Sequence, residues 1–102
     1  MARIFVTPQA EADLAKIQDD IAERAGTEIA SRFVERLLAV IKTVAITPLA
    51  SGRPVPKLGL NLRCHPFGNY NIYLAYDAAA DTLHVVRVLH GRRRITARYF
   101  RP

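Results

Sequence analysis

Residues 62–77 have the sequence LRCHPFGNYNIYLAYD, in which side chains alternate in polarity on both sides of the pair Gly68-Asn69. Alternation with a period of two is typical of β-strands, and Gly-Asn predicts a tight turn, so this stretch should fold as an antiparallel hairpin. One face of the first strand should carry Leu60, Leu62 and Cys64, with Asn61, Arg63 and His65 opposite. One face of the second strand should carry Tyr70, Ile72, Leu74 and Tyr76, with Asn71, Tyr73 and Ala75 opposite.

A third strand is predicted at residues 83–90, LHVVRVLH, after a turn region at residues 78–81. It extends the hairpin into an antiparallel meander. A short strand candidate at residues 2–7, ARIFVT, should join the same sheet. Alternation in the third strand predicts Leu83, Val85, Arg87 and Leu89 on one face and His84, Val86, Val88 and His90 on the other.

Two amphipathic helices are expected between the first strand and the hairpin. In the first helix, Thr7 can act as the N-cap, Pro8 suits the first position, and Gly26 suits the C-terminal end. In the second helix, Thr27 can act as the N-cap, and Pro48 should end the helix. Because only Gly26 and Thr27 separate the two helices, we expect the helices to pack as an antiparallel hairpin. The apolar stripes are Ala10, Leu14, Ile17 and Ile21 in the first helix, and Ile29, Phe33, Leu37, Val40, Ile41 and Val44, widened by Val34 and Leu38, in the second.

The element order β-α-α-β-β-β predicts an α+β fold in a single domain covering residues 1–102. We expect an antiparallel β-sheet, an N-terminal helical hairpin packed on one of its faces, and a basic C-terminal tail. Residues 48–60, with three prolines and two glycines, are expected to form an irregular connector. The other face of the sheet should stay partly open, and Arg63 and Arg87 should point toward it, because burying an unpaired charge is costly.

The formal charge of +6 is unevenly distributed. Residues 1–59 have a net charge of +1, whereas residues 60–102 contain seven arginines and two aspartates, a net charge of +5. Arginine presents a planar fork of donors that suits phosphate and carboxylate, so the second part should meet an anionic partner. The single cysteine, Cys64, has no partner for an internal disulfide, and no Cys/His cluster has metal-site spacing. We therefore expect a cytoplasmic protein with no metal, cofactor or membrane segment.

The segments LRCHPFGNYNIYLAYD and LHVVRVLHGRRRI, in this order after two helices, resemble the RelE/ParE superfamily of type II toxins, and the stretches R-x-x-P-F-G-N-Y and V-V-R-V-L-H-G-x-R resemble its ParE-like branch. The resemblance covers nearly the whole chain. It implies a toxin silenced by direct binding of its antitoxin, whose acidic, amphipathic C-terminal segment would wrap it. ParE-like members are associated with inhibition of DNA gyrase, and RelE-like members with mRNA cleavage on the ribosome. Arg94 is a departure, since many relatives have an aspartate there.

Two kinds of site remain open for the second part of the chain. Cleavage of RNA through the 2′-hydroxyl needs a base, an acid and cations, for which the candidates are Arg63, Arg87, His90 and Tyr99, with His65, Tyr73 and Arg93 as further possibilities. We favour a binding surface for a target or antitoxin, made of Arg63, Arg87, His90, Arg92, Arg93, Arg94 and Arg98.

Several of these residues also have plain structural interpretations. Arg87 could pair with a helix carboxylate such as Glu11 or Asp13, and the arginine run could be a solvated tail. His90 could shape the turn, and Gly91 could allow a backbone conformation that a larger residue resists. Tyr99 and Phe100 could pin the tail to the body or anchor a partner.

Three functions follow as hypotheses. The first is a ParE-like toxin that inhibits gyrase, arrests growth and stabilises plasmids, without catalysis of its own. The second is a ribosome-dependent mRNA endonuclease. The third is a basic nucleic-acid-binding module without toxicity.

Overall fold

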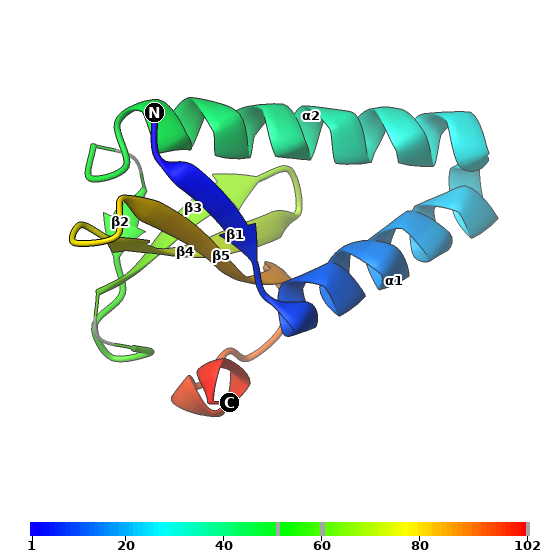
Figure 1. Cartoon of the computed structure of the whole chain (residues 1–102). Helices are drawn as coiled ribbons and strands as arrows, with labels where there is room; N and C mark the ends of the chain where they lie inside the picture. Colours follow the sequence, from blue (N-terminus) through cyan, green and yellow to red (C-terminus); the bar gives the residue numbers. More distant parts are fainter. Residues whose placement is uncertain (51, 60, 102) are drawn as a thin grey trace.

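The computed structural model describes residues 1–50, 52–59 and 61–101. A helical hairpin and a five-stranded sheet form an α+β fold (Figure 1). The sheet order is β1-β5-β4-β3-β2. The elements are β1 (Arg3–Val6), α1 (Pro8–Ala25), α2 (Thr27–Ile46), β2 (Arg53–Pro54), β3 (Leu62–Phe67), β4 (Tyr70–Asp77), β5 (Thr82–His90) and the short 3₁₀ helix η1 (Ala97–Phe100).

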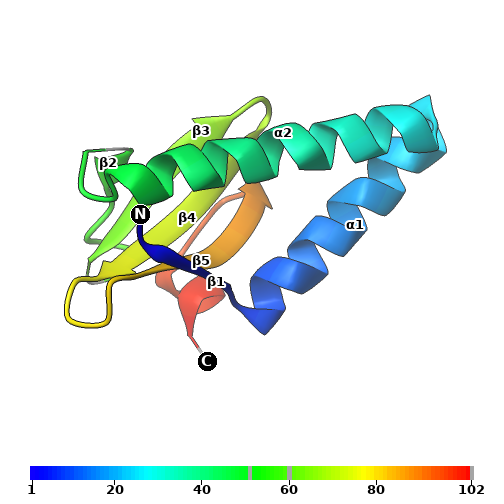
Figure 2. The ribbon, with the colours of Figure 1, turned by 45° about the horizontal axis from the view of Figure 1, so that its top comes forward.

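The two helices begin and end close to the predicted positions (Figure 2). The Thr7 side chain caps α1 by accepting a hydrogen bond from the Ala10 backbone N–H at 3.1 Å, and Pro8 opens the helix. Gly26 ends α1 with φ of 95°, in the region that favours glycine. Thr27 does not cap the second helix, since it is the first residue of α2 and the N-cap is Gly26.

Strand β1 joins the sheet as predicted, but its pairing is parallel whereas the other pairs are antiparallel. It pairs with β5 in parallel, from Arg3 opposite Thr82 to Val6 opposite Val85, so the sheet is mixed rather than wholly antiparallel. The connector also contains a strand that was not predicted, since β2 pairs with β3. It has only two residues and includes a proline, so it has no alternation to detect.

The hairpin register follows the predicted alternation in β3 and β4. Leu62 and Cys64 lie opposite Ala75 and Tyr73, and the turn at Gly68-Asn69 joins the strands with φ of 56° at Gly68. Ile72 and Leu74 pack toward the helices, whereas Tyr73 packs on the other face. Leu60, which was predicted on the same face as Leu62 and Cys64, lies outside the described residues.

The predicted faces of β5 are wrong after Val86. Tyr73 pairs with Arg87 and the next residue, Leu74, pairs with Val85, so Val86 is an extra residue that bulges. A bulge reverses the direction of the side chains that follow. Val88 therefore joins Leu83 and Val85 in the helix-side core, and Leu89 joins the opposite face.

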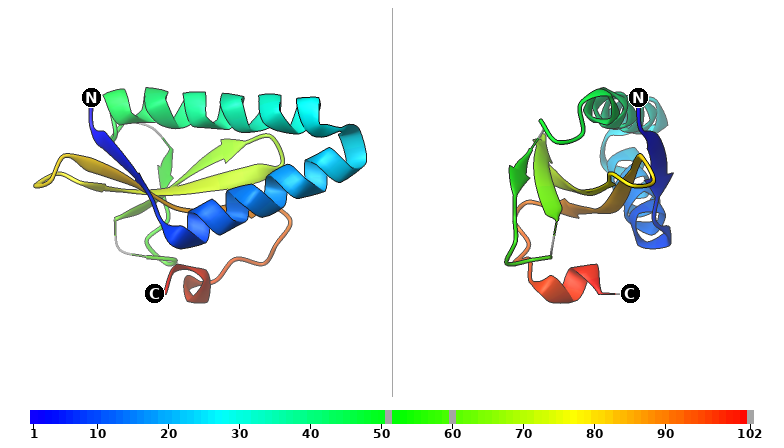
Figure 3. Two further views of the ribbon diagram at one scale, coloured as in Figure 1. Left: turned by 45° about the vertical axis from the view of Figure 1, so that its right-hand side comes forward. Right: turned by 60° about the vertical axis from the view of Figure 1, so that its left-hand side comes forward.

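Both faces of the sheet are covered. The helix-side core is built around Leu37, Ile41, Val44, Ile72 and Val85, all at most 2% exposed. On the other face, the tail crosses the sheet opposite α2 (Figure 3), and Ile95, Tyr99 and Phe100 pack against a second core of Leu62, Cys64, Tyr73 and Leu89. The expected open face is therefore absent from the part of the sheet that the tail covers, because the tail supplies its own apolar side chains.

In the described ranges, neither helix is sufficiently long and apolar to cross a bilayer.

Candidate functional site

Arg87 lies on β5 beyond the end of β1 and is held by three hydrogen bonds. Its Nε and Nη2 donate to the two carboxylate oxygens of Asp13 on α1, at 2.7 and 2.8 Å. Its Nη1 donates to the backbone carbonyl of Tyr99 at 2.9 Å, and the guanidinium lies 5.6 Å from the centre of the Tyr99 ring. The ion-pair interpretation is confirmed, with Asp13 rather than Glu11 as the partner.

Asp13 supplies a hydrogen-bond acceptor at the edge of β5 beyond the end of β1. Strand β1 ends at Val6, and Thr7 continues the hydrogen bonding along the edge of β5. Its backbone N–H donates to the carbonyl of Val85 at 3.1 Å, and its hydroxyl donates to the carbonyl of Val86 at 2.8 Å. The next free N–H of the edge, that of Val88, donates to Asp13 at 3.0 Å. The carboxylate thus completes the edge of the sheet and binds Arg87 at the same time.

The pair is largely shielded from solvent, with side-chain exposures of 18% for Arg87 and 13% for Asp13. The hydrogen bond from Arg87 to Asp13 raises the pKa of Arg87 above its ordinary value, which outweighs the opposing effect of burial. Arg87 therefore stays charged and fixed, connecting α1, β5 and the tail.

His90 shapes the turn that follows β5. Its Nδ1 accepts the backbone N–H of Arg92 at 3.1 Å, its carbonyl accepts that of Arg93 at 3.1 Å, and its ring packs edge-on against Tyr70. Gly91 donates its N–H to the Asn69 carbonyl at 2.8 Å. An added Cβ at Gly91 would lie 3.3 Å from that oxygen, which is a tight contact, so the close approach of two backbones, rather than an unusual φ, favours glycine here.

Tyr99 and Phe100 anchor the tail to the sheet. Phe100 packs edge-on against Tyr73 at 4.8 Å between ring centres. Tyr73 is 4% exposed, so it is a core residue beneath the tail. Burial raises the pKa of the Tyr73 hydroxyl and of the neighbouring Cys64 thiol.

Arg63 and Arg87 do not share a face. Arg63 pairs across the sheet with Leu74, which packs toward the helices, whereas Arg87 pairs with Tyr73 on the tail side. Arg63 donates to the carbonyl of Gly52 in the connector at 2.9 Å. His65 also lies away from His90, beside Val40 and Val44 of α2. The four nuclease candidates are therefore not gathered around one point.

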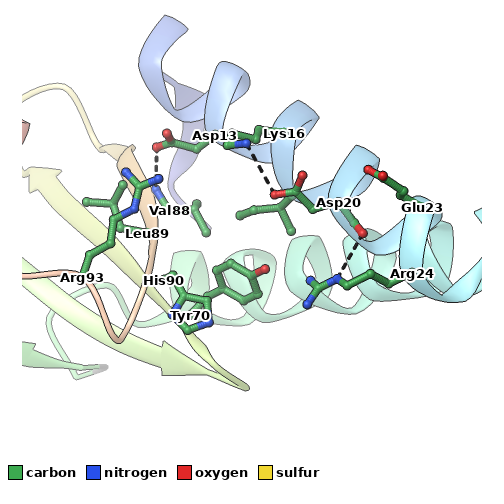
Figure 4. A pocket seen from close by; sticks show the side chains of 11 residues that line it. Asp13, Lys16, Asp20, Glu23, Arg24, Tyr70, Val88, Leu89, His90 and Arg93 are labelled. Carbon is green, nitrogen blue, oxygen red and sulfur yellow. Dashed lines mark hydrogen bonds and ion pairs between the residues drawn. The ribbon is translucent and has the colours of Figure 1, made fainter.

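The arginines of the tail are exposed and divide between two hollows. Arg93 lines a pocket of about 580 Å³ between α1 and the end of β5 (Figure 4). Arg94 and Arg98 line a second pocket, of about 480 Å³, next to Arg87 and Tyr99. The run Arg92–Arg94, which was predicted as one surface, is thus divided: Arg93 faces one pocket, Arg94 faces the other, and Arg92 lines neither of these two.

The pocket in Figure 4 has mixed charge. Its α1 wall carries Asp13, Lys16, Asp20, Glu23 and Arg24, of which Lys16 and Asp20 form an ion pair at 3.6 Å. Of these residues, the sequence singled out only Asp13, as a possible partner of Arg87. Their helical spacing shows a shared face, but only the fold shows that β5 ends opposite it.

Within residues 1–50, 52–59 and 61–101, no group of three or more His, Cys, Asp or Glu side chains is arranged to hold a metal ion.

Comparison with known proteins agrees with this fold. Residues 4–95 match the family model described as the ParE toxin of the type II toxin–antitoxin system parDE. Among solved structures, a chain of the chromosomal ParDE toxin–antitoxin system from P. aeruginosa superposes with a TM-score of 0.77 at 19% identity, over 88% of this chain and 96% of the other. A chain of the RelBE2 toxin–antitoxin complex from Mycobacterium tuberculosis gives 0.62 at 21% identity, over 87% and 96%. The search of curated proteins returned no match.

Proposed function

The chain belongs to the ParE toxin family of type II toxin–antitoxin systems, and from this membership we propose that it inhibits DNA gyrase in the cytoplasm and that a cognate antitoxin neutralises it by direct binding. The proposed outcome in the cell is growth arrest when the antitoxin is lost, which is how such a pair would stabilise a plasmid.

The exposed arginines of the C-terminal tail are the observation that carries this proposal. Arg92, Arg93, Arg94 and Arg98 are exposed, and no acidic residue follows Asp81. Within the part of the chain that the structure describes, none of their side chains has an ion-pair partner. A concentrated positive surface of this kind attracts an anionic macromolecule, such as the DNA on which gyrase acts or the acidic segment of an antitoxin.

The geometry favours an inhibitor over a ribonuclease. Catalysis needs an acid and a base on either side of one phosphate, with cations beside it. Here Arg87 uses three of its N–H donors within the fold, and the Nδ1 of His90 accepts a backbone N–H. Arg63 lies on the opposite face of the sheet from Arg87, so it does not add a cation beside Arg87 for binding one phosphate. A binding role requires only the exposed charge that the tail provides.

For the antitoxin we propose two contact regions. An acidic segment would bind Arg92 and Arg93 at the tail, and the adjacent pocket between α1 and β5 would receive the side chains that continue from it. Lys16, Arg24 and Arg93 in that pocket match carboxylates, whereas Asp20 and Glu23 match a basic residue of the same segment.

The test is supercoiling of relaxed plasmid by purified gyrase in the presence of the toxin. Inhibition that the antitoxin reverses is expected. Absence of inhibition, together with new 5′ ends on translated mRNA after induction of the toxin, would establish the endonuclease in its place.

A further inference from the structure

A pocket of about 480 Å³ lies between the end of β5 and the tail, and its polar lining is entirely basic or neutral. It is lined by Arg87, Arg94, Thr96, Arg98 and Tyr99. A smaller hollow of about 190 Å³ shares Arg87 and Tyr99 and adds Arg101. No aspartate or glutamate lines either one among the described residues. Cations that outnumber the acids around a concave site raise the local concentration of anions.

Arg87 gives this pocket a fixed cation. A guanidinium has five N–H donors. Three of these donors are used, two for Asp13 and one for the Tyr99 carbonyl, so one remains on each of Nη1 and Nη2. The bidentate pair with Asp13 holds the plane of the group in place, which lowers the entropy lost when a ligand binds. Arg94 and Arg98 are exposed and can adjust around the same ligand.

We propose that this pocket, formed by Arg87, Arg94, Thr96 and Arg98, binds a phosphate group of a nucleic-acid backbone. Arginine forks match phosphate oxygens in pairs, and the Thr96 hydroxyl is a further donor. Asp13 offsets one of the three arginine charges, so an excess of positive charge remains for the ligand. The site deepens the proposed function and rests on it, because the DNA bound by gyrase would supply the phosphate.

The arrangement of the two hollows favours a phosphate chain over an acidic protein segment. They share Arg87 and Tyr99, and arginines continue from one to the other, with Arg94 and Arg98 on one side and Arg101 beyond. A nucleic-acid backbone carries one charge at every residue and can place successive phosphates in adjoining sites. The pocket between α1 and the end of β5, which Arg93 lines, is different. Three carboxylates, those of Asp13, Asp20 and Glu23, also line it and would repel a phosphate chain.

The experiment is direct binding of labelled duplex DNA, single-stranded DNA and RNA of one sequence, measured by fluorescence anisotropy over a range of salt concentrations. The test variant is Arg94→Ala/Arg98→Ala. The control is Arg36→Ala/Lys42→Ala, which removes the same charge from exposed positions of α2, across the sheet from the tail. A labelled poly-glutamate peptide measures binding of an acidic chain. Circular dichroism checks that each variant is folded.

The test variant should bind duplex DNA at least about tenfold more weakly than the control. The slope of log K against log salt concentration should become shallower by about 0.9 for each phosphate that the variant no longer neutralises. Equal weakening in both variants would overturn the proposal, and so would pocket-dependent binding of poly-glutamate without binding of nucleic acid. The DNA and RNA arms show which nucleic acid supplies the phosphate. A toxin that leaves gyrase active but binds nucleic acid through Arg94 and Arg98 would refute the proposed function and support the phosphate site.

Discussion

The bond between Arg87 and Asp13 should be the most important single polar contact for stability. The two side chains are 74 positions apart in the chain and connect the first helix, the last strand and the tail. We consider Asp13→Asn, which keeps the shape of the side chain but removes its charge and replaces one acceptor oxygen with a donor. The Val88 N–H and two donors of Arg87 then compete for a single oxygen.

The structure sets the size of the effect. Removing one partner of a buried ion pair costs about 3–5 kcal/mol, because the remaining charge is left without compensation. With 13% and 18% exposure, some solvent screening remains, so we expect the lower end, about 3 kcal/mol. For a domain of this size that corresponds to a fall in Tm of about 12–24 °C.

The chain provides a matched control in the ion pair between Glu28 and Arg32. Its distance of 2.6 Å is no longer than that of Arg87 and Asp13, but its side chains are 81% and 68% exposed. Exposed pairs one helical turn apart contribute about 0.3–0.5 kcal/mol, so Glu28→Gln should change little. The difference between the two variants reports the contribution of burial together with that of the additional hydrogen bonds that Asp13 accepts.

The assay is urea unfolding followed by circular dichroism on wild type, Asp13→Asn, Arg87→Gln and the double variant. The double variant should lose less free energy of unfolding than the sum of the losses in Asp13→Asn and Arg87→Gln, because the second substitution removes a side chain that the first has already left unpaired. A loss in Asp13→Asn no larger than that in Glu28→Gln would refute the reasoning, as would strictly additive losses.

Three further predictions concern the tail and the second core. Phe100→Ala should lower the free energy of unfolding by about 1–2 kcal/mol, because it uncovers the ring of Tyr73, and an unchanged urea midpoint would show that the tail is not anchored there. Gly91→Ala should cost about 1 kcal/mol by pushing the chain away from the Asn69 carbonyl, whereas Gly59→Ala, whose new methyl would meet only ordinary contacts at 3.5 Å, should cost less in the same titration. Burial raises the pKa of Cys64 and Tyr73, so the unfolded chain loses these protons at a lower pH than the folded chain does. The free energy of unfolding should therefore keep its full value below pH 9.0, the ordinary pKa of the thiol, and should fall as the pH rises above it. Cys64→Ser should reduce this alkaline loss of stability.

Local signals account for the parts of the fold that sequence predicted well. Thr7-Pro8, Gly26 and Pro48 mark the helix boundaries, since capping and helix termination depend on neighbouring residues. The β3–β4 hairpin follows from alternation and one turn. The direction of β1 was missed because its partner lies at the other end of the chain, and nothing in four residues specifies a parallel neighbour.

The candidate site was harder to predict, because it depends on the bulge at Val86. No glycine or other turn residue marks this position, and the alternation of LHVVRVLH is equally good with or without a bulge. The bulge reverses Val88 and Leu89, gives the tail an apolar face to cover, and sets Arg87 at the strand edge that Asp13 completes. The role of Asp13 could be named as one of two possibilities from its place in the helix, but only the fold selected it.

The central claim is that this chain inhibits gyrase through the arginines of its tail. It is tested most directly by titrating the toxin into a gyrase supercoiling reaction, with wild type compared with Arg92→Ala/Arg93→Ala/Arg94→Ala. These side chains are exposed, so the variant should keep the wild-type Tm. We predict that wild type blocks supercoiling and that the triple variant requires at least about tenfold more protein to do so. Full supercoiling activity in the presence of excess wild-type toxin would contradict the claim.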